Sequence, residues 1–215
     1  MSFSRDVLRL DAAKAIDSIS AAIRAQVHKG LRRKGAVIGV SGGVDSSVCA
    51  ALCARALGKE SVLVLFMPDR DSSKDSLRLG RLLVQTFDLP SRVEDIEPAL
   101  TAPGRYERHL QAHPQVFPEY GEGWKSKITI PSILAGDRLN LFRLEVETPA
   151  GERRSERMGP AAYLQLVAAT NFKQRTRKMM EYYHADRLSY GVCGTPSRLE
   201  YDQGFFVKGG DGSAD

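Results

Sequence analysis

The sequence Ala36-Val-Ile-Gly-Val-Ser-Gly-Gly-Val-Asp-Ser-Ser47 decides the fold of this chain. Residues 36–40 are mostly apolar and rich in β-branched types, which predicts a short buried strand. A serine and two glycines then break the strand, and residues 44–57 follow with helical spacing. The pattern predicts a strand, a glycine turn and a helix N-terminus, and it puts one set of side chains on the apolar face of the helix: Val44, Val48, Ala51, Leu52 and Leu57.

This arrangement makes an anion-binding site from backbone groups. The first N–H groups of a helix have no intrahelical partner, and the helix dipole favours negative charge there. Gly42 and Gly43 allow the backbone to approach a phosphate and to adopt positive φ angles. Ser41, Ser46 and Ser47 add hydroxyl donors. The loop is therefore a candidate phosphate-binding site.

Asp45 is the unusual member of the loop, because a carboxylate repels an anion unless a cation lies between them. It therefore indicates a Mg²⁺ ion that bridges carboxylate and phosphate oxygens. The loop lacks the Walker pattern. It resembles the pyrophosphate-binding loop of the N-type ATP pyrophosphatases, which cleave ATP between the α and β phosphates. The alternative is an ordinary strand-to-helix turn capped by serine.

Composition and length indicate one α/β domain over residues 1–215. Hydrophobic residues make up 42% and charged residues 27%, which is ordinary for a soluble globular protein. No apolar run approaches a membrane span and no signal-peptide core is present, so we expect a cytoplasmic protein with no membrane partner. Cys49, Cys53 and Cys193 show no disulfide or zinc pattern and are expected to be reduced core thiols.

The net charge of +5 suits an anionic substrate. The basic run at 32–34 has no interleaved aromatic residues, and it reads better as a solvated helix end than as a nucleic-acid surface. We therefore expect no nucleic-acid partner.

Strands and helices alternate along much of the chain, which predicts a doubly wound parallel sheet with helices on both faces. The further strands are expected at 61–66, from residue 92, and at 188–193. An amphipathic helix precedes Gly30, another starts at Pro160, and a third spans about 76–87. The side chains expected to face inward from this third helix are Leu79, Leu82, Leu83 and Phe87.

Residues 98–159 interrupt the alternation of strands and helices and are expected to be an insertion within the domain. Segments 139–147 and 153–158 flank Pro149-Ala-Gly151 and predict a β-hairpin. His109 and His113 have the spacing of half a zinc motif, but the glutamate and third ligand are missing, so solvated histidines are favoured. The insertion could be a lid, an interface arm or an excursion with no role.

Later motifs appear in a particular order. Asn171 is followed by Arg175-Thr-Arg177, Gly194-Thr195 is followed by Glu200, and Phe205-Phe leads to a glycine- and acid-rich end. Either arginine of the first motif could aim its guanidinium at a ligand, or simply pair with an acid. The four motifs together resemble those of ammonia-dependent NAD⁺ synthases.

The resemblance implies roles for particular residues. ATP contacts would come from Ser41, Gly42, Gly43, Val44, Asp45, Ser46, Ser47 and Thr195. Asp45 and Glu200 would bind Mg²⁺. Arg175, Lys208 and Asp215 would hold deamido-NAD. Asp45 and Asp211 would be the catalytic pair, with Asp211 helping to place ammonia.

The implied reaction is ATP-dependent amidation of deamido-NAD by ammonia through an adenylated carboxylate, with release of AMP and pyrophosphate. The resemblance also implies a homodimer that uses free ammonia, unless a separate glutaminase docks. Family members continue beyond the point that matches Asp215, so the sequence resembles a synthase lacking its C-terminal part and is expected to turn over weakly or not at all alone. The alternatives are another ATP pyrophosphatase, of the tRNA-thiolating type, and a non-catalytic nucleotide-binding fragment.

Overall fold

The computed structural model describes residues 4, 9–130 and 141–215, which form two compact units. The first unit contains the chain up to Pro98 and again from Gln174, and the second contains Ala99–Lys173. The second unit overlaps the predicted insertion at 98–159 and extends beyond it. Among the described residues, no helix is both long enough and apolar enough to cross a membrane.

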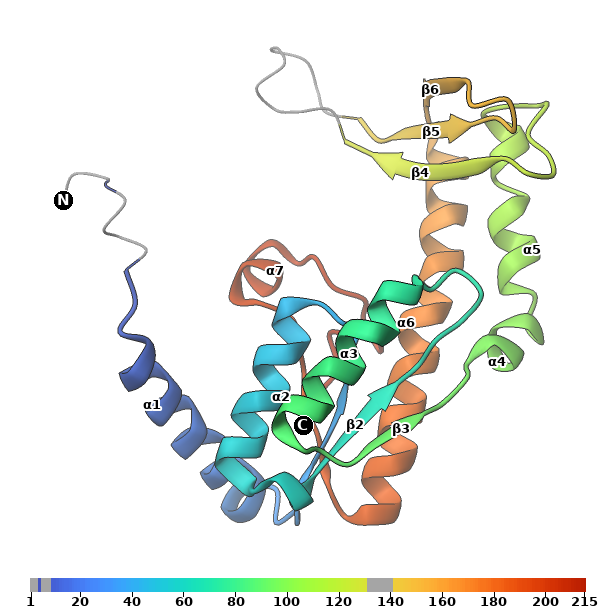
Figure 1. The fold of residues 1–215 in the computed structure, drawn as a ribbon. Coiled ribbons are helices and arrows are strands. Elements are labelled where there is room, and N and C mark those ends of the chain that lie inside the picture. The colour runs from blue at the N-terminus through green and yellow to red at the C-terminus, as the bar shows by residue number, and fades with distance from the viewer. Residues whose placement is uncertain (1–3, 5–8, 131–140) are drawn as a thin grey trace. The chain divides into compact units, whose positions relative to one another are not determined.

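The first unit is built on a four-stranded parallel sheet, as the sequence predicts (Figure 1). Its strands lie in the order β3-β2-β1-β7, with bounds β1 Ala36–Gly39, β2 Val62–Phe66, β3 Ser91–Val93 and β7 Gly191–Val192. The residue Ala36 is paired with Val62 on one side and with Gly191 on the other. The strand that leads into the glycine loop is therefore held from both sides.

Helices cover both faces of this sheet, which confirms the doubly wound α/β class. The helices that lie wholly or partly in the first unit are α1 Ala12–Ala25, continued by a π-helical turn Gln26–Gly30, α2 Val44–Leu57, α3 Lys74–Phe87, α4 Glu97–Thr101, α6 Pro160–Leu188 and α7 Arg198–Gln203, with a 3₁₀ turn at Lys59–Ser61. Side chains of α2 and α3 pack on one face, and Glu181 of α6 lies against Gly39 of β1 on the other. The helix starts predicted at Val44 and Pro160 are confirmed.

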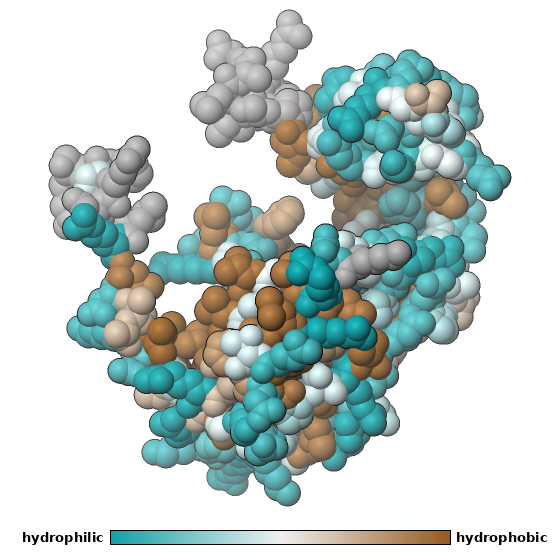
Figure 2. Space-filling view, in the orientation of Figure 1, coloured by the Kyte–Doolittle hydropathy of each residue, from teal (hydrophilic) through white to brown (hydrophobic). Residues whose placement is uncertain are grey.

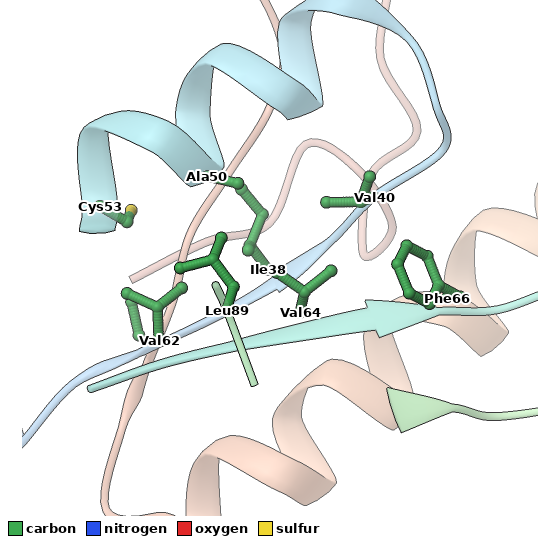
Figure 3. Close-up of a cluster of buried hydrophobic side chains, with 9 residues drawn as sticks. Ile38, Val40, Ala50, Cys53, Val62, Val64, Phe66 and Leu89 are labelled. Carbon is green, nitrogen blue, oxygen red and sulfur yellow. The ribbon is translucent and has the colours of Figure 1, made fainter. Parts of the chain in front are cut away.

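The core of the first unit lies between the sheet and α2 (Figure 3). Small residues of α2 face it, among them Ala50 and Cys53. The predicted apolar face is therefore wrong for Val44 and Val48, which are 73% and 50% exposed. The short side chains let the helix backbone approach the β-branched strand residues, so the bulkier valines turn outward.

Helix α3 also presents a different face from the predicted one. Leu77, Leu83 and Val84 pack on the core, whereas Leu79, Leu82 and Phe87 are exposed, so of the predicted inward set only Leu83 is correct. Gly80 explains this orientation, because a Cβ there would lie 2.5 Å from the Phe66 ring. The helix approaches the sheet through its glycine, and apolar side chains gather on the surface over α2 and α3 (Figure 2).

The second unit contains a three-stranded antiparallel sheet in the order β4-β5-β6. Its elements are α5 Arg105–Leu110, a 3₁₀ turn His113–Gln115, β4 Lys125–Thr129, β5 Arg143–Glu147 and β6 Arg153–Arg157. The predicted hairpin is confirmed for β5 and β6, although its expected start at Leu139 lies outside the described residues. The strand β4 was not predicted. Leu144 and Val146 pack on Phe117 and Leu166 to form the core of this unit.

His113 is fully buried in this unit, so its prediction as a solvated histidine is wrong. Its Nδ1 lies 3.0 Å from the His109 carbonyl, which can only accept, so Nε2 accepts a hydrogen bond from the Ser126 hydroxyl at 2.7 Å. The ring stacks on Tyr120. Burial lowers the pKa of His113, while the nearby backbone hydrogen bonds oppose that shift.

The boundary between α6 and β7 differs from the prediction of a strand over 188–193. The helix continues through Leu188, Ser189 reverses the chain with a φ of 58°, and only Gly191 and Val192 form β7. The left-handed residue lets a long helix return directly into the sheet.

Candidate functional site

The loop between β1 and α2 is closed by its own serine hydroxyls. Ser46 and Ser47 donate to the Gly43 carbonyl at 3.2 and 2.8 Å, and the Gly43 amide donates to the Ser41 hydroxyl at 3.3 Å. The Ser41 amide donates to the Ser46 hydroxyl at 3.3 Å. These bonds fix the curvature of the loop at the start of the helix, where unpaired amides are expected.

The two glycines of the loop have different roles. Gly42 has a φ of +82°, and a Cβ there would lie 2.5 Å from the Ser76 carbonyl oxygen. Gly43 is extended, with φ of −81°, so the expected positive φ is confirmed for Gly42 and wrong for Gly43. Val44 and Asp45 open α2, and both are exposed. The loop thus leaves the aspartate at the surface of the helix N-terminus.

Thr195 and Glu200 follow the neighbouring strand. Because β7 is parallel to β1, both residues come after the same edge of the sheet as Asp45. Ser197 caps α7, its hydroxyl accepting from the Glu200 amide while Glu200 Oε2 accepts from the Ser197 amide at 2.6 Å. This capping box fixes the orientation of the glutamate and uses one of its two carboxylate oxygens.

The loop after α7 is held by its aspartates. Asp211 Oδ1 accepts from the amides of Val207 and Gly212 at 2.6 and 3.1 Å. Asp215 accepts from the Val192 amide at 2.9 Å, and its own amide donates to the Val192 carbonyl at 3.1 Å. The carboxylates of both predicted site residues therefore also hold this segment in a defined shape beside β7.

Helix α6 carries the arginine predicted to hold substrate. Arg175 is exposed, and its Nε donates to the Lys208 carbonyl at 3.2 Å. Gly210 lies against Gln174, where a Cβ would approach to 2.9 Å. The structure thus brings Arg175 next to the loop that contains Lys208, Asp211 and Asp215.

A buried charged cluster lies beside these residues and was missed by the sequence prediction. Lys178 and Glu181 are only 6% and 7% exposed and form an ion pair at 2.5 Å. Burial raises the pKa of Glu181, an effect that Lys178 and Arg177 oppose. Burial also lowers the pKa of Arg177, and Asp69, just after β2, opposes that shift most strongly. The arginine pair was the only sequence signal here, because nothing marked Glu181 as buried.

The acids suit a divalent ion by their chemistry. Mg²⁺ is usually held by one or two carboxylates together with substrate phosphates and water. Asp45 is exposed, and Glu200 retains a carboxylate oxygen outside the capping box. Within the described residues, no cluster of three or more histidine, cysteine or acidic side chains is arranged to hold a metal ion by protein ligands alone. The donor set therefore fits an ion that arrives with a phosphate.

The parallel sheet, with its glycine loop at the carboxyl end of a central strand, defines a doubly wound α/β domain, a class whose ligands bind at this edge of the sheet. The family model described as NAD synthase matches residues 15–117 and 143–215. The chain belongs to the NAD synthase family.

Two similar relatives come from rhizobial bacteria. The NH(3)-dependent NAD(+) synthetase of Mesorhizobium japonicum is 58% identical over 209 residues, which cover 97% of this chain and 66% of the relative. That of Rhizobium rhizogenes is 56% identical over 212 residues, covering 99% and 64% respectively. The chain thus spans just under two thirds of the length of these relatives.

A solved structure supports the fold alone. The NH3-dependent NAD synthetase of Campylobacter jejuni, solved in complex with nitrate, matches with a TM-score of 0.63 and 23% identity, covering 96% of this chain and 66% of that one.

Proposed function

We propose that this chain takes part in the ATP-dependent amidation of deamido-NAD to NAD⁺ by ammonia. The observation that carries the proposal is the loop 41–47, whose hydroxyl bonds and left-handed Gly42 hold a helix N-terminus at the carboxyl end of β1. Membership of the NAD synthase family supports the choice of substrates.

The proposed reaction requires that the two anionic substrates be aligned and that their negative charge be neutralised. A nicotinate carboxylate attacks the α phosphorus of ATP, giving an acyl adenylate and pyrophosphate, and ammonia then displaces AMP to form the amide. The loop amides and serine hydroxyls would hold the β and γ phosphates, Thr195 would contact ATP, and Arg175, Lys208 and Asp215 would hold deamido-NAD. Asp211 would help to place ammonia. These groups act by orienting two anions and stabilising the leaving pyrophosphate.

Mg²⁺ is the proposed cofactor, with Asp45 and Glu200 as its protein ligands. When bound, it would neutralise charge on the phosphate oxygens. The capping box supports this assignment, because it holds the Glu200 carboxylate in a fixed orientation.

We also propose a cellular compartment and an oligomeric state for the chain. Three free cysteines support a reducing compartment such as the cytoplasm. The exposed apolar residues of α3, including Leu79, Leu82 and Phe87, support a homodimer. Sedimentation of the chain and of its Leu82→Glu variant tests the second point, since a dimer through this face would dissociate in the variant.

The test of function is pyrophosphate release, measured with ATP and Mg²⁺ in the presence and absence of deamido-NAD and ammonium. The proposal requires either release that depends on deamido-NAD or, if turnover is too slow, calorimetric binding of both nucleotides. Binding of ATP without any binding of deamido-NAD would favour a non-catalytic nucleotide-binding fragment. Binding of tRNA would favour the thiolating alternative.

A further inference from the structure

The buried ion pair between Lys178 and Glu181 lies where several segments of the first unit meet. Glu181 Oε1 is 2.4 Å from the position that a Cβ on Gly39 would occupy, so the carboxylate rests against bare backbone of β1. Gly39 is two residues before the loop that starts at Ser41. The missing side chain at Gly39 leaves the room that the carboxylate fills.

Other charged groups surround this carboxylate. Arg177 interacts electrostatically with Glu181 and with Asp69, which follows β2. Asp211, which ties together the loop 207–212, also acts on Glu181, and the same loop contacts Gln174 and Arg175 of α6. Charged groups from α6, from the segment after β2 and from the loop 207–212 therefore share one electrostatic cluster.

Stability alone does not explain such a cluster. Removing charges from water is costly, and a buried ion pair can often be replaced by apolar residues with no loss of stability. The same space between α6 and β1 could hold two apolar side chains. A buried pair is instead suited to fixing one arrangement of its neighbours, because each charge must keep its partner.

We propose that Glu181 is a positioning residue: paired with Lys178 and seated on Gly39, it fixes the exit of β1 into loop 41–47 and the placement of Arg177 and loop 207–212. Glu181 need not touch substrate in this role. It sets the geometry of the groups that are proposed to do so, and the ligand-binding part of the inference rests on the proposed function.

The experiment compares three variants of the chain. Glu181→Gln leaves Lys178 buried without its ion-pair partner and is expected to lower the melting temperature. The double variant Lys178→Met/Glu181→Leu replaces both charges by apolar side chains and is expected to restore the melting temperature. Asp17→Asn is the control, because it breaks an ion pair with Arg55 that is exposed on both sides.

Two readouts then separate positioning from simple packing. Amide hydrogen exchange is expected to be faster at 41–47 and 207–212 in the double variant, despite its restored melting temperature. Its affinity for ATP–Mg²⁺ and for deamido-NAD, measured by calorimetry, is expected to fall about 10–100-fold, as for other residues that orient ligand-binding groups. The control should match the wild type in both.

If amide exchange and nucleotide affinity in the double variant equal those of the wild type, the inference is overturned, and the ion pair contributes only to packing. If the double variant does not fold, exchange in Glu181→Gln, measured well below its melting temperature, decides the same point. A wild-type chain that binds neither nucleotide would refute the proposed function, whereas the exchange comparison would still decide the role of Glu181.

Discussion

Replacing Gly42 by alanine tests whether the turn after β1 needs a glycine. Gly42 has a φ of +82°, which alanine adopts at a cost of about 1–2 kcal/mol. The added Cβ would also lie 2.5 Å from the Ser76 carbonyl oxygen and 2.9 Å from its Cα. These contacts are with backbone at the start of α3, so they cannot be relieved by turning a side chain.

The magnitude follows from these two costs. Forcing extra atoms into a packed site typically costs about 1–3 kcal/mol. We therefore expect Gly42→Ala to lower the free energy of unfolding of the first unit by about 2–5 kcal/mol. Because the strain falls on the candidate phosphate loop, ATP–Mg²⁺ binding should weaken as well.

The adjacent glycine provides a matched control. Gly43 is extended, and a Cβ there would lie 3.3 Å from only the Ser41 hydroxyl, so Gly43→Ala should cost less than about 1 kcal/mol. Urea denaturation followed by circular dichroism measures both variants. Equal midpoints for Gly42→Ala and the wild type, or an equal loss in the two variants, would refute the reasoning.

Three further outcomes are expected. Burial lowers the pKa of His113 in the folded chain, so as the pH falls the unfolded chain takes up the proton first, and the second unit should lose stability below about pH 6.5. His113→Gln should flatten the slope of stability against pH, measured by the fluorescence of Trp124, the only tryptophan. Ser197→Ala removes the cap of α7 and should speed amide exchange over 198–203, at a cost of about 1 kcal/mol. Leu144→Ala should cost the second unit about 2–5 kcal/mol, measured by urea denaturation, whereas Lys127→Ala on the next strand should cost less than about 1 kcal/mol.

Each of these outcomes has a contrary result. A pH slope unchanged in His113→Gln would assign the titration to another group. Unchanged exchange in Ser197→Ala would mean that α7 is held by contacts other than its cap. Similar losses for Leu144→Ala and Lys127→Ala would mean that the two faces of the antiparallel sheet contribute alike.

The order of elements in the first unit could be predicted because each boundary between two elements has a local cause in the sequence. The apolar run before Ser41 and the glycines after it indicate a strand and a turn on their own. Helix faces were harder to predict. On α2 the residues that reach the sheet are small, and a pattern that ranks side chains by apolar size selects Val44 and Val48 instead.

Other features depend on tertiary contacts that no local pattern records. The strand β4 reads Lys-Ser-Lys-Ile-Thr, which has only one apolar residue, and it pairs with β5 partly through cross-strand ion pairs such as Lys127 with Glu145. In the sequence Glu181 resembles an ordinary glutamate on a helix surface, and only the folded chain shows that it packs against Gly39. The roles of the candidate site residues stay predictions, since they concern ligands.

The pairing of Ala36 with Gly191 has a consequence for how the chain is made. Strand β1 leaves the ribosome early, yet its second neighbour, β7, emerges only after the whole second unit. Until then one edge of β1 offers unpaired backbone groups to any other extended chain. A nascent chain of this protein therefore passes through a long interval in which chaperone cover at that edge would favour a productive outcome, and contacts so distant in sequence should make the last step of folding slow.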